Sequence, residues 1–541
     1  MPIFILMAEK VIVIGAGLAG LTAAIELLEA GQPVLLLDRG PAEGLGGLAR
    51  WAMGGLFYVD SPFQRKAGLR DSPERAWADW QSFAQFAPED HWPRAWAEQY
   101  VHRCTPDVYE WLKPKGVRYI PSVQWLERGW HQPGNSVPRF HVVWGTGQGL
   151  VQCLLAYLDA HPYRDRLTLR FEQEVTDLIG DHQQVRGVRG RDLRNGEPFA
   201  YEGAAVILAA GGITGSVERV KRHWYAPWGT PPETLLTGSH PVANGDMHDL
   251  AARHGAQLTH LDRQWNYAAG VHHPDALHPA HGLSLVPPKT ALWLDAWGER
   301  FGPDPMISGF DTRWLVEQVA RSGDSHSWLV LNRKIALKEL GVSGSLYNDA
   351  MRERKILPFL LNLIRGNNSL LNTLSQRCPD WLQANSVAAL AQQMNQLAGN
   401  NHIDAVRLQA QLTAFDRAIA GETEDEQVRR IDELRQYRGD RLRTCARQPI
   451  LAEGAGPLIA IRVFLLTRKS LGGLQTNLDS QVLTSGDSPI AGLYAVGEVA
   501  GFGGGGIHGL RALEGTFLGN CIFNARMAVR HILGKTAQVN A

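Results

Sequence analysis

The sequence predicts an α/β fold that is built on a parallel sheet and interrupted by an inserted domain. Residues 10–38 are typical of a strand, a glycine turn, a helix and a second strand, and the two apolar runs suit buried strands. Similar strand-to-glycine turns recur at residues 204–212 and 492–506. The stretch between them is mixed and then mostly helical, and 541 residues are too many for one ordinary core.

These observations predict a discontinuous arrangement of domains. We expect residues 1–262 and 466–541 to form the two parts of a Rossmann-type nucleotide-binding domain, and residues 263–465 to form an inserted α+β capping domain that meets the substrate. Inside the insert, residues 386–397 and 406–420 carry helical periodicity.

Composition excludes several classes of function. Lys plus Arg and Asp plus Glu each number 54, so the chain lacks the basic surplus of a nucleic-acid-binding protein. The five cysteines are scattered, odd in number and form no CxxC, which argues against a zinc site, an iron–sulfur cluster or a disulfide framework. We expect no bound metal and a cytoplasmic location.

The N-terminal stretch MPIFILM is apolar but too short for a signal peptide or a membrane span, and Met7 is an alternative start. No other stretch is apolar and long enough to cross a bilayer, so we expect no stable membrane insertion.

The first motif with chemical meaning is the glycine turn Gly15-Ala16-Gly17-Leu18-Ala19-Gly20. Gly15 permits the tight turn, Gly17 lets the backbone approach a pyrophosphate, and Gly20 allows close packing of helix and strand. Asp38 ends the next strand, where a carboxylate can accept from ribose hydroxyls. The alternative is a tight turn that binds no ligand.

NAD and FAD share this turn, and three further features favour FAD. A glycine-rich loop at residues 44–55 suits the pyrophosphate and the flavin edge. A second strand-to-glycine turn at residues 207–212 has the spacing to contact the adenosine end, and Glu498 falls where the ribitol or pyrophosphate is expected. Only one complete strand–turn–helix–strand unit carries a GxGxxG turn, so a separate nicotinamide site is not predicted.

With this glycine turn, the glycine-rich loop and the segment around Glu498, the chain resembles the fumarate reductase/succinate dehydrogenase flavoprotein family. Within that family it resembles the branch of FAD-binding dehydrogenases related to ketosteroid dehydrogenases. The resemblance covers most of the chain and implies a capping domain that closes over the isoalloxazine ring. The motifs that carry it are VIVIGAGLAGLTAA, GLGGLARWAMGGL, GDMHDLAARHGAQL, TRKSLGGLQTN and GLYAVGEVAGFGGGGIHGLRALEGTFLGN.

By position in those motifs, the resemblance implies a set of FAD contacts. They are Gly15, Ala16, Gly17, Leu18, Ala19, Gly20, Asp38, Arg39, Gly46, Gly47, Gly54, Gly55, Val175, Ala210, Gly211, Asp246, Glu498 and Thr516. Several relatives attach FAD through a histidine just before the AxGG loop. No histidine occurs between Gly44 and Gly55, so we expect non-covalent FAD.

The catalytic end departs from the patterns of the family. Where ketosteroid dehydrogenases carry a tyrosine base in a segment like PFYAV, this chain has Ile459, which cannot move a proton. Where soluble fumarate reductases carry HHTMGG, this chain has RKSLGG, with Lys469 at a catalytic histidine position. Their HGANR corresponds to a segment from His508 to Arg511, which displaces the arginine by one residue.

Five residues remain as catalytic candidates: Lys469, Arg468, Arg511, His508 and Arg313. The first four fall in segments that flank the flavin in relatives, where cations can hold a carboxylate, polarise a carbonyl or stabilise anionic reduced flavin. A lysine whose pKa is lowered by burial can also act as a base. The alternatives are surface or interdomain ion pairs for Arg468 and Lys469, and a helix-surface position for Arg313.

The neighbouring His272 and His273 are a candidate metal or acid–base pair, but we expect them to be solvent-exposed because no carboxylate signature lies near them.

Three functions follow from these residues. The first is an FAD-dependent dehydrogenase that removes a hydride and a proton from a CH–CH pair next to a carbonyl, as in a ketosteroid, and passes electrons to an unidentified acceptor. The second is a fumarate-reductase-like enzyme that reduces an unsaturated carboxylate. The third is a flavin-binding protein without turnover. A small-molecule substrate is expected in the first two, and the oligomeric state is left open.

Overall fold

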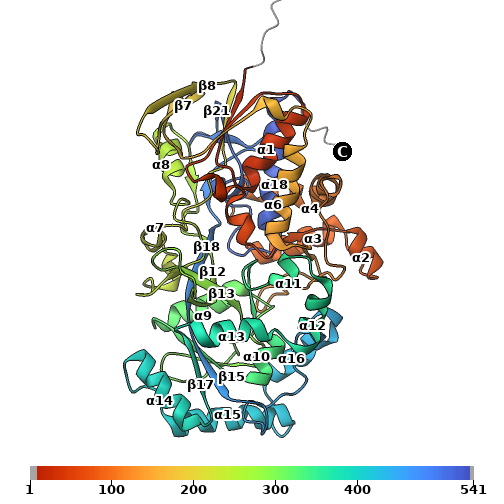
Figure 1. The fold of residues 1–541 in the computed structure, drawn as a ribbon, viewed down its shortest axis with the longest axis vertical. Helices are drawn as coiled ribbons and strands as arrows, with labels where there is room; N and C mark the ends of the chain where they lie inside the picture. The colour runs from red at the N-terminus through yellow and green to blue at the C-terminus, as the bar shows by residue number, and fades with distance from the viewer. Residues whose placement is uncertain (1–8, 536–541) are drawn as a thin grey trace, which may run out of the picture.

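The computed structural model describes residues 9–535, so the alternative start at Met7 falls outside the described residues. Figure 1 shows two halves stacked along the long axis of the molecule. The upper half is built on a parallel sheet with long helices beside it, and the lower half is built on an antiparallel sheet ringed by shorter helices. Both sheets agree with the predicted fold class.

The parallel sheet brings three glycine turns to one edge. Its strand order is β20-β21-β9-β1-β2-β5, and only the β20–β21 pair is antiparallel. In the middle, Val11 lies opposite Val34 on one side and Ala205 on the other. The carboxyl ends of β1, β2 and β9 therefore meet, which is where open α/β sheets bind ligands. The strands are β1 (Val11–Ile14), β2 (Val34–Leu37), β5 (Leu167–Arg170), β9 (Ala205–Leu208), β20 (Gln481–Leu483) and β21 (Pro489–Ala495).

Two long helices, one from each end of the chain, pack together beside this sheet (Figure 1). Helix α1 (Leu18–Glu29) buries ten of its twelve residues, and α18 (Thr516–Ile532) lies against it. The C-terminal segment thus packs against the N-terminal fold. The other elements of this half are β3 (Gly55–Phe57), α2 (Pro62–Lys66), α3 (Pro73–Ala84), α4 (His91–Arg103), α5 (Glu110–Leu112), β4 (Phe140–Val142), α6 (Thr146–Asp159), the meander β6 (Gln173–Gly180), β7 (Val185–Asp192) and β8 (Pro198–Glu202), α7 (Val217–Arg222), α8 (Asp246–Arg253), β11 (Leu258–Thr259) and β19 (Gly473–Leu474).

One long strand organises the antiparallel sheet. Strand β18 (Leu458–Ser470) pairs with β12, β15 and β17 in antiparallel fashion and with β10 in parallel fashion. It runs past residue 465, the expected end of the insert, so its last residues reach the parallel-sheet half. The other strands are β10 (Leu236–Thr237), β12 (Gln264–His272), β13 (Gly282–Val286), β14 (Leu292–Leu294), β15 (Ser327–Asn332), β16 (Gly341–Val342) and β17 (Trp381–Ala384).

The helices of the lower half include the two predicted by periodicity. Residues 386–397 and 406–420 correspond to α14 (Val387–Ala398) and α15 (Ala405–Ala420), each of which begins after a side-chain N-cap. The others are α9 (Thr312–Ser322), α10 (Arg333–Glu339), α11 (Asp349–Arg352), α12 (Ile356–Arg365), α13 (Asn368–Arg377), α16 (Glu426–Gln436) and α17 (Arg438–Arg441). No helix within residues 9–535 is both long and apolar enough to cross a membrane.

A buried histidine in β4 makes stability depend on pH. His141 Nδ1 lies 2.8 Å from the Arg139 carbonyl oxygen and Nε2 lies 2.7 Å from Ser61 Oγ. Since a carbonyl can only accept, Nδ1 carries the proton and Nε2 accepts from the serine hydroxyl. Burial lowers the pKa of His141 to about 4. The neutral ring therefore stabilises the fold fully at pH values above the ordinary histidine pKa. This stabilisation falls as the pH drops from about 6.5 towards 4.

We expect this histidine alone to lower the free energy of unfolding by about 2 kcal/mol when the pH is reduced from 7 to 5. Urea unfolding of wild type and His141→Gln at both pH values measures it. The variant starts less stable at pH 7, because it loses the fitted ring, but it declines less on acidification. An equal decline in both proteins would contradict the assignment.

Candidate active site

The turn between β1 and α1 shows why glycine stands at each of its three positions. Gly15 has a φ of +103°, and a Cβ there would lie 2.4 Å from the Ala209 carbonyl oxygen. A Cβ on Gly20 would lie 1.9 Å from the carbonyl oxygen of Gly15. A Cβ on Gly17 would meet no protein atom within 4 Å. The first and third glycines are thus required by packing, whereas the second faces open space.

Asp38 ties the end of β2 to this turn. One carboxylate oxygen accepts from the Ala16 backbone N–H at 2.6 Å, and the other accepts from that of Gly40 at 2.7 Å. Burial raises the pKa of Asp38, and the two backbone donors oppose that shift. The carboxylate is therefore fixed at the carboxyl edge of the sheet, beside the first turn of α1.

A cleft opens at this edge and gathers seven of the predicted cofactor residues. They are Gly15, Asp38, Arg39, Val175, Ala210, Gly211 and Asp246. Arg39 spans the cleft, because its guanidinium contacts Asp246 at 2.8 Å and Glu174 at 3.2 Å.

His248 also lines the cleft; it lies in the segment GDMHDLAARHGAQL but is not among the FAD contacts predicted from the sequence. It is buried, and neither ring nitrogen has a hydrogen-bond partner among the described residues.

The other predicted cofactor residues are not part of the cleft lining. The Gly46 backbone N–H donates to the Ala16 carbonyl at 2.8 Å, and Gly47 lies against Gly17, so this part of the glycine-rich loop follows the turn. Gly54 and Gly55 instead face protein, since a Cβ on them would strike Thr146 and the Phe140 ring. Leu18 and Ala19 belong to the buried first turn of α1.

Glu498 and Thr516 lie farther along, beside the end of β18 and at the start of α18. Glu498 accepts from the Ser470 backbone N–H at 2.8 Å, and burial raises its pKa to about 7. The Thr516 hydroxyl donates to the Leu513 carbonyl at 2.6 Å and accepts from His508 Nε2 at 2.9 Å.

These residues fit an extended dinucleotide, which carries the negative charge of its pyrophosphate near the middle. Gly17 leaves space, the N-terminus of α1 supplies backbone N–H groups and a positive dipole end, and Asp38 and Glu498 place carboxylates on either side.

A bulge at the end of β18 presents two cations side by side. Trp265 of β12 lies opposite Lys469, but the next residue, Asn266, lies opposite Thr467, so Arg468 is the extra residue of the bulge. Bulges of this kind re-aim side chains and recur beside active sites. Arg468 and Lys469 lie deep in the molecule yet keep accessible surface, as side chains that line an internal space do.

Within residues 9–535, neither cation belongs to an ion pair. No acidic oxygen lies within 4.0 Å of either side chain in the part of the chain that the structure describes, contrary to the alternative that they serve structural salt bridges. The Arg468 guanidinium has no protein hydrogen bond in this part of the chain either, and packs over the Cα of Gly238. Arg468 is therefore held as a charge without a fixed partner, and Lys469 has no acidic one within these residues.

Lys469 begins a chain of hydrogen bonds that the sequence did not reveal. Its Nζ donates to the Tyr267 hydroxyl at 3.1 Å, and that hydroxyl donates to Glu514 at 2.7 Å. The same Glu514 oxygen accepts from the Trp265 indole at 2.9 Å. Lys469 Nζ also lies 3.9 Å from the centre of the Phe517 ring. Burial lowers the pKa of Lys469 to about 8, while the charge of Glu514 opposes the shift.

The phenol of this chain stays protonated at neutral pH. Burial and the adjoining Glu514 carboxylate raise the pKa of Tyr267 well above its usual value. Tyr267 therefore carries a proton that Glu514 is positioned to take, and its oxygen can accept another in exchange. Glu514 lies in a quoted motif and could have been selected from it, whereas Tyr267 lies in no motif.

The remaining candidates have fixed structural partners. Arg511 donates to Asp311 at 3.0 Å and also to Gln85, so its charge is neutralised. His508 is buried, stacks on Trp80, and has a pKa well below the usual value because of burial. These two lie in the same region as Lys469, but neither carries a free proton or charge at neutral pH.

Two expectations about exposure are wrong. Arg313 is buried rather than on a helix surface, because its guanidinium packs 4.5 Å from the Tyr225 ring centre and 4.6 Å from that of Trp228. Arginine tolerates such burial over aromatic faces. His273 is buried too, stacked 4.2 Å from the His281 ring, whereas His272 remains partly exposed and contacts Asp380 at 2.8 Å.

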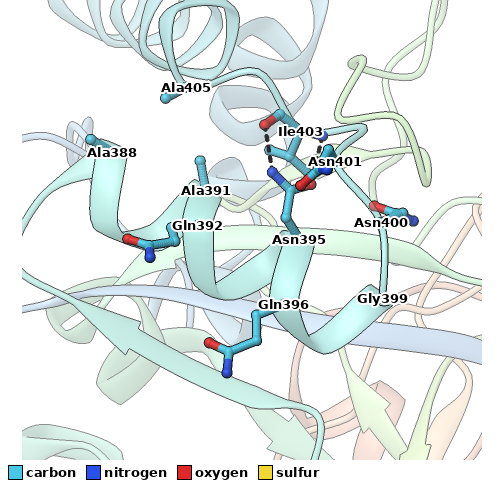
Figure 2. A pocket seen from close by; sticks show the side chains of 10 residues that line it. All are labelled: Ala388, Ala391, Gln392, Asn395, Gln396, Gly399, Asn400, Asn401, Ile403 and Ala405. Atoms are coloured by element: carbon cyan, nitrogen blue, oxygen red, sulfur yellow. Dashed lines mark hydrogen bonds between the residues drawn. The ribbon is translucent and has the colours of Figure 1, made fainter.

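A second hollow, between α14 and the start of α15, lacks the groups that chemistry needs (Figure 2). It is lined by alanines, glutamines, asparagines, one glycine and one isoleucine. The Asn395 amide bonds both the carbonyl and the N–H of Ile403, each at 2.9 Å, and so serves to hold the connecting loop. None of the lining side chains can titrate near neutral pH, so we do not place the active site there.

With this geometry in view, comparison with known proteins identifies the family. The chain matches the family described as FAD binding domain over residues 10–518. The chain belongs to this family. It is 42% identical to a KsdD-like steroid dehydrogenase of Mycobacterium tuberculosis, covering 96% of this chain and 94% of the relative, and 41% identical to one of Mycolicibacterium smegmatis, covering 94% and 96%.

Two solved structures share the fold. The first is a 3-ketosteroid delta1-dehydrogenase from Sterolibacterium denitrificans, with a TM-score of 0.70, 17% identity and coverage of 98% of this chain and 100% of that one. The second is a flavocytochrome c3 fumarate reductase, with a TM-score of 0.69, 18% identity and coverage of 98% and 79%. They confirm the predicted fold, a Rossmann-type domain with an antiparallel capping part. This family member is an FAD-dependent oxidoreductase of the CH–CH dehydrogenase family, as the sequence predicts.

Proposed function

We propose that this protein is a dehydrogenase that removes a hydride and a proton from neighbouring carbons next to a carbonyl in a ketosteroid-like substrate. The observation that carries this proposal is the chain Lys469–Tyr267–Glu514 beside the unpartnered Arg468. It supplies a proton path and a cation, the two functions that such a reaction needs. The names of relatives at 41–42% identity support the same substrate class.

We propose that non-covalent FAD occupies the cleft at the carboxyl edge of the parallel sheet. The turn from Gly15 to Gly20 and the N-terminus of α1 would hold the pyrophosphate, Asp38 the ribose, and Glu498 the ribitol side. When bound, FAD supplies the acceptor for the hydride. Residues 1–262 and 466–541 remain our proposal for the cofactor domain, with 263–465 as the capping domain.

The proton leaves through the tyrosine. The Tyr267 oxygen takes the proton from the carbon next to the carbonyl while its own proton moves to Glu514, 2.7 Å away. Lys469 donates to the same oxygen at 3.1 Å and stabilises negative charge that develops on it. Arg468 polarises the substrate carbonyl, because its guanidinium has no competing partner among the described residues. Tyr267 thus takes the role of the base whose usual position is occupied by Ile459.

A reductase of unsaturated carboxylates is the second candidate, favoured by the same free Arg468. An uncompensated guanidinium is well suited to hold a carboxylate. In that direction the proton would travel from Tyr267 to the substrate carbon.

Anaerobic mixing of the purified protein with a panel of ketosteroids and saturated dicarboxylates tests both candidates. We expect ketosteroids to bleach the flavin absorbance band, since the reaction moves two electrons onto the cofactor. Bleaching by succinate-like acids alone would favour the second candidate. A normal flavin spectrum that neither group bleaches would overturn both. The electron acceptor is then sought by adding quinones and dyes to the reduced protein.

The non-covalent state of FAD has a simple test. No histidine lies between Gly44 and Gly55, where several relatives attach the cofactor. Acid precipitation of the holoprotein should therefore release all of the FAD into the supernatant, measured by its absorbance. Flavin that stays with the protein pellet would show a covalent bond.

The charge of Lys469 predicts an alkaline limit on turnover. Its pKa is lowered to about 8 by burial, so the ammonium that donates to Tyr267 is lost as the pH rises through that value. We expect kcat to fall about tenfold per pH unit above it. Lys469→Arg keeps the positive charge and should shift this alkaline fall in kcat to higher pH. A kcat profile that is unchanged in Lys469→Arg would contradict the role of this lysine.

A further inference from the structure

Helix α12 (Ile356–Arg365) presents an apolar face that none of residues 9–535 covers. No residue of this helix is buried, although seven of its ten residues are Ile, Leu or Phe. Five of them stand among the most exposed large apolar side chains of the described residues: Ile356 at 62%, Leu357 at 74%, Leu360 at 46%, Leu361 at 47% and Ile364 at 76%. Isolated exposed leucines are ordinary, but a contiguous group of this kind marks an interaction site.

The helix is attached by its opposite side. At about 100° per residue, the five exposed residues fall within an arc of about 140°, and Phe359 and Leu363 fall on the other side. Phe359 packs edge-on against Trp144, with ring centres 5.3 Å apart, and both Phe359 and Leu363 are only partly exposed. The label of α12 stands near the right-hand edge of the lower half in Figure 1, on the outside of the molecule. The apolar face is therefore held outwards by packing behind it.

Positive charge surrounds this face. Residues 349–365 carry four basic side chains, Arg352, Arg354, Lys355 and Arg365, against the two acids Asp349 and Glu353. The two acids pair with two of these bases, Asp349 with Arg352 and Glu353 with Lys355, which leaves Arg354 and Arg365 as the surplus. The adjacent α10 adds exposed or partly exposed Arg333, Lys334 and Lys338. The segment that bears the apolar face, and the neighbouring helix, therefore carry a net positive charge.

We propose that α12 is a peripheral membrane anchor that lies in the surface of an anionic lipid bilayer. An apolar helix face with a basic margin matches both layers of such a surface, the acyl boundary and the negative headgroups. The exposed side chains would enter about 5–10 Å, and the basic residues would stay at headgroup level. This attachment requires no helix that spans the membrane, and it is independent of the proposed substrate.

Sedimentation of the full-length holoprotein with lipid vesicles tests the anchor. We expect binding to vesicles that contain phosphatidylglycerol and weaker binding to pure phosphatidylcholine. In the double variant Leu357→Glu/Ile364→Glu, partition should fall by roughly tenfold for each side chain removed from the lipid. Lys355→Glu/Arg365→Glu should weaken binding to the anionic vesicles alone. Val406→Glu on α15 alters an equally exposed apolar residue, at 79%, and should bind as wild type does.

Flavin absorbance and turnover with a soluble substrate should be the same in all of these proteins, since the substituted side chains are exposed. Wild type that does not sediment with anionic vesicles would overturn the proposal, as would a double variant that binds as well as wild type. The mass in solution is measured in parallel by light scattering. A dimer that the α12 substitutions convert to a monomer, without vesicle binding, would assign the face to a second copy of the chain and also overturn the proposal.

Discussion

Replacing Tyr267 by Phe should lower kcat by roughly 10²–10⁴, the usual contribution of a positioned proton-transfer group. The variant keeps the ring and removes only the oxygen that lies 3.1 Å from Lys469 Nζ and 2.7 Å from Glu514. Without that oxygen, neither neighbour has a partner through which to exchange the substrate proton. The rate of flavin bleaching in stopped flow, at saturating ketosteroid, measures the step directly.

The bound flavin should change little, because Tyr267 is not among the residues of the proposed cofactor cleft. Tyr494→Phe is the matched control, since it also removes one partly buried hydroxyl, which bonds His531 at 2.9 Å, but at β21. It should cost about 1 kcal/mol of stability and leave kcat unchanged. If Tyr267→Phe bleaches as fast as wild type, the proton takes another route and Glu514 has only a structural role.

The contrast between Tyr267 and the glycine turn shows what a sequence can reveal. The pattern of residues 10–38 is local, so a strand, a turn and a helix could be predicted from neighbours alone, and the structure has them. Tyr267 acquires its role from Lys469, which is 202 positions away and reaches it through the pairing of β12 with β18. Because no local pattern encodes that pairing, the sequence indicated Lys469 but not its partner.

The bulge at Arg468 was unpredictable for the same reason. In an unbroken strand, Arg468 and Lys469 would point to opposite faces. The extra residue appears only in the pairing register of β18 with β12, which shifts after Trp265 and depends on both strands. Arg313 illustrates a different limit. The sequence favoured a helix-surface position for it, but the burial comes from Tyr225 and Trp228, which a distant loop brings to it.

The glycines of the first turn permit a test that separates folding from cofactor binding. Gly20→Val should fail to give folded protein, because its Cβ would lie 1.9 Å from the Gly15 carbonyl oxygen, at the junction of β1 and α1. The helix would have to move away from the sheet, and α18, which packs on α1, would lose its support. Soluble yield and the circular dichroism of Gly20→Val measure this. Normal amounts of folded protein would contradict it.

Gly17→Val should have the opposite result, folded protein that lacks FAD. The position has a φ of −74° and extended ψ, which valine adopts without strain, and a Cβ there meets no protein atom within 4 Å. The added methyl groups instead fill the space in which the pyrophosphate is proposed to lie. We expect FAD affinity to fall by roughly 100-fold, about 2.7 kcal/mol, with the circular dichroism of the apoprotein retained. Titration of the wild-type and Gly17→Val apoproteins with FAD, followed by flavin fluorescence, gives the two dissociation constants. A Gly17→Val protein that binds FAD as tightly as wild type would mean that the open side of this turn faces solvent, and the cofactor would then have to be placed elsewhere in the cleft.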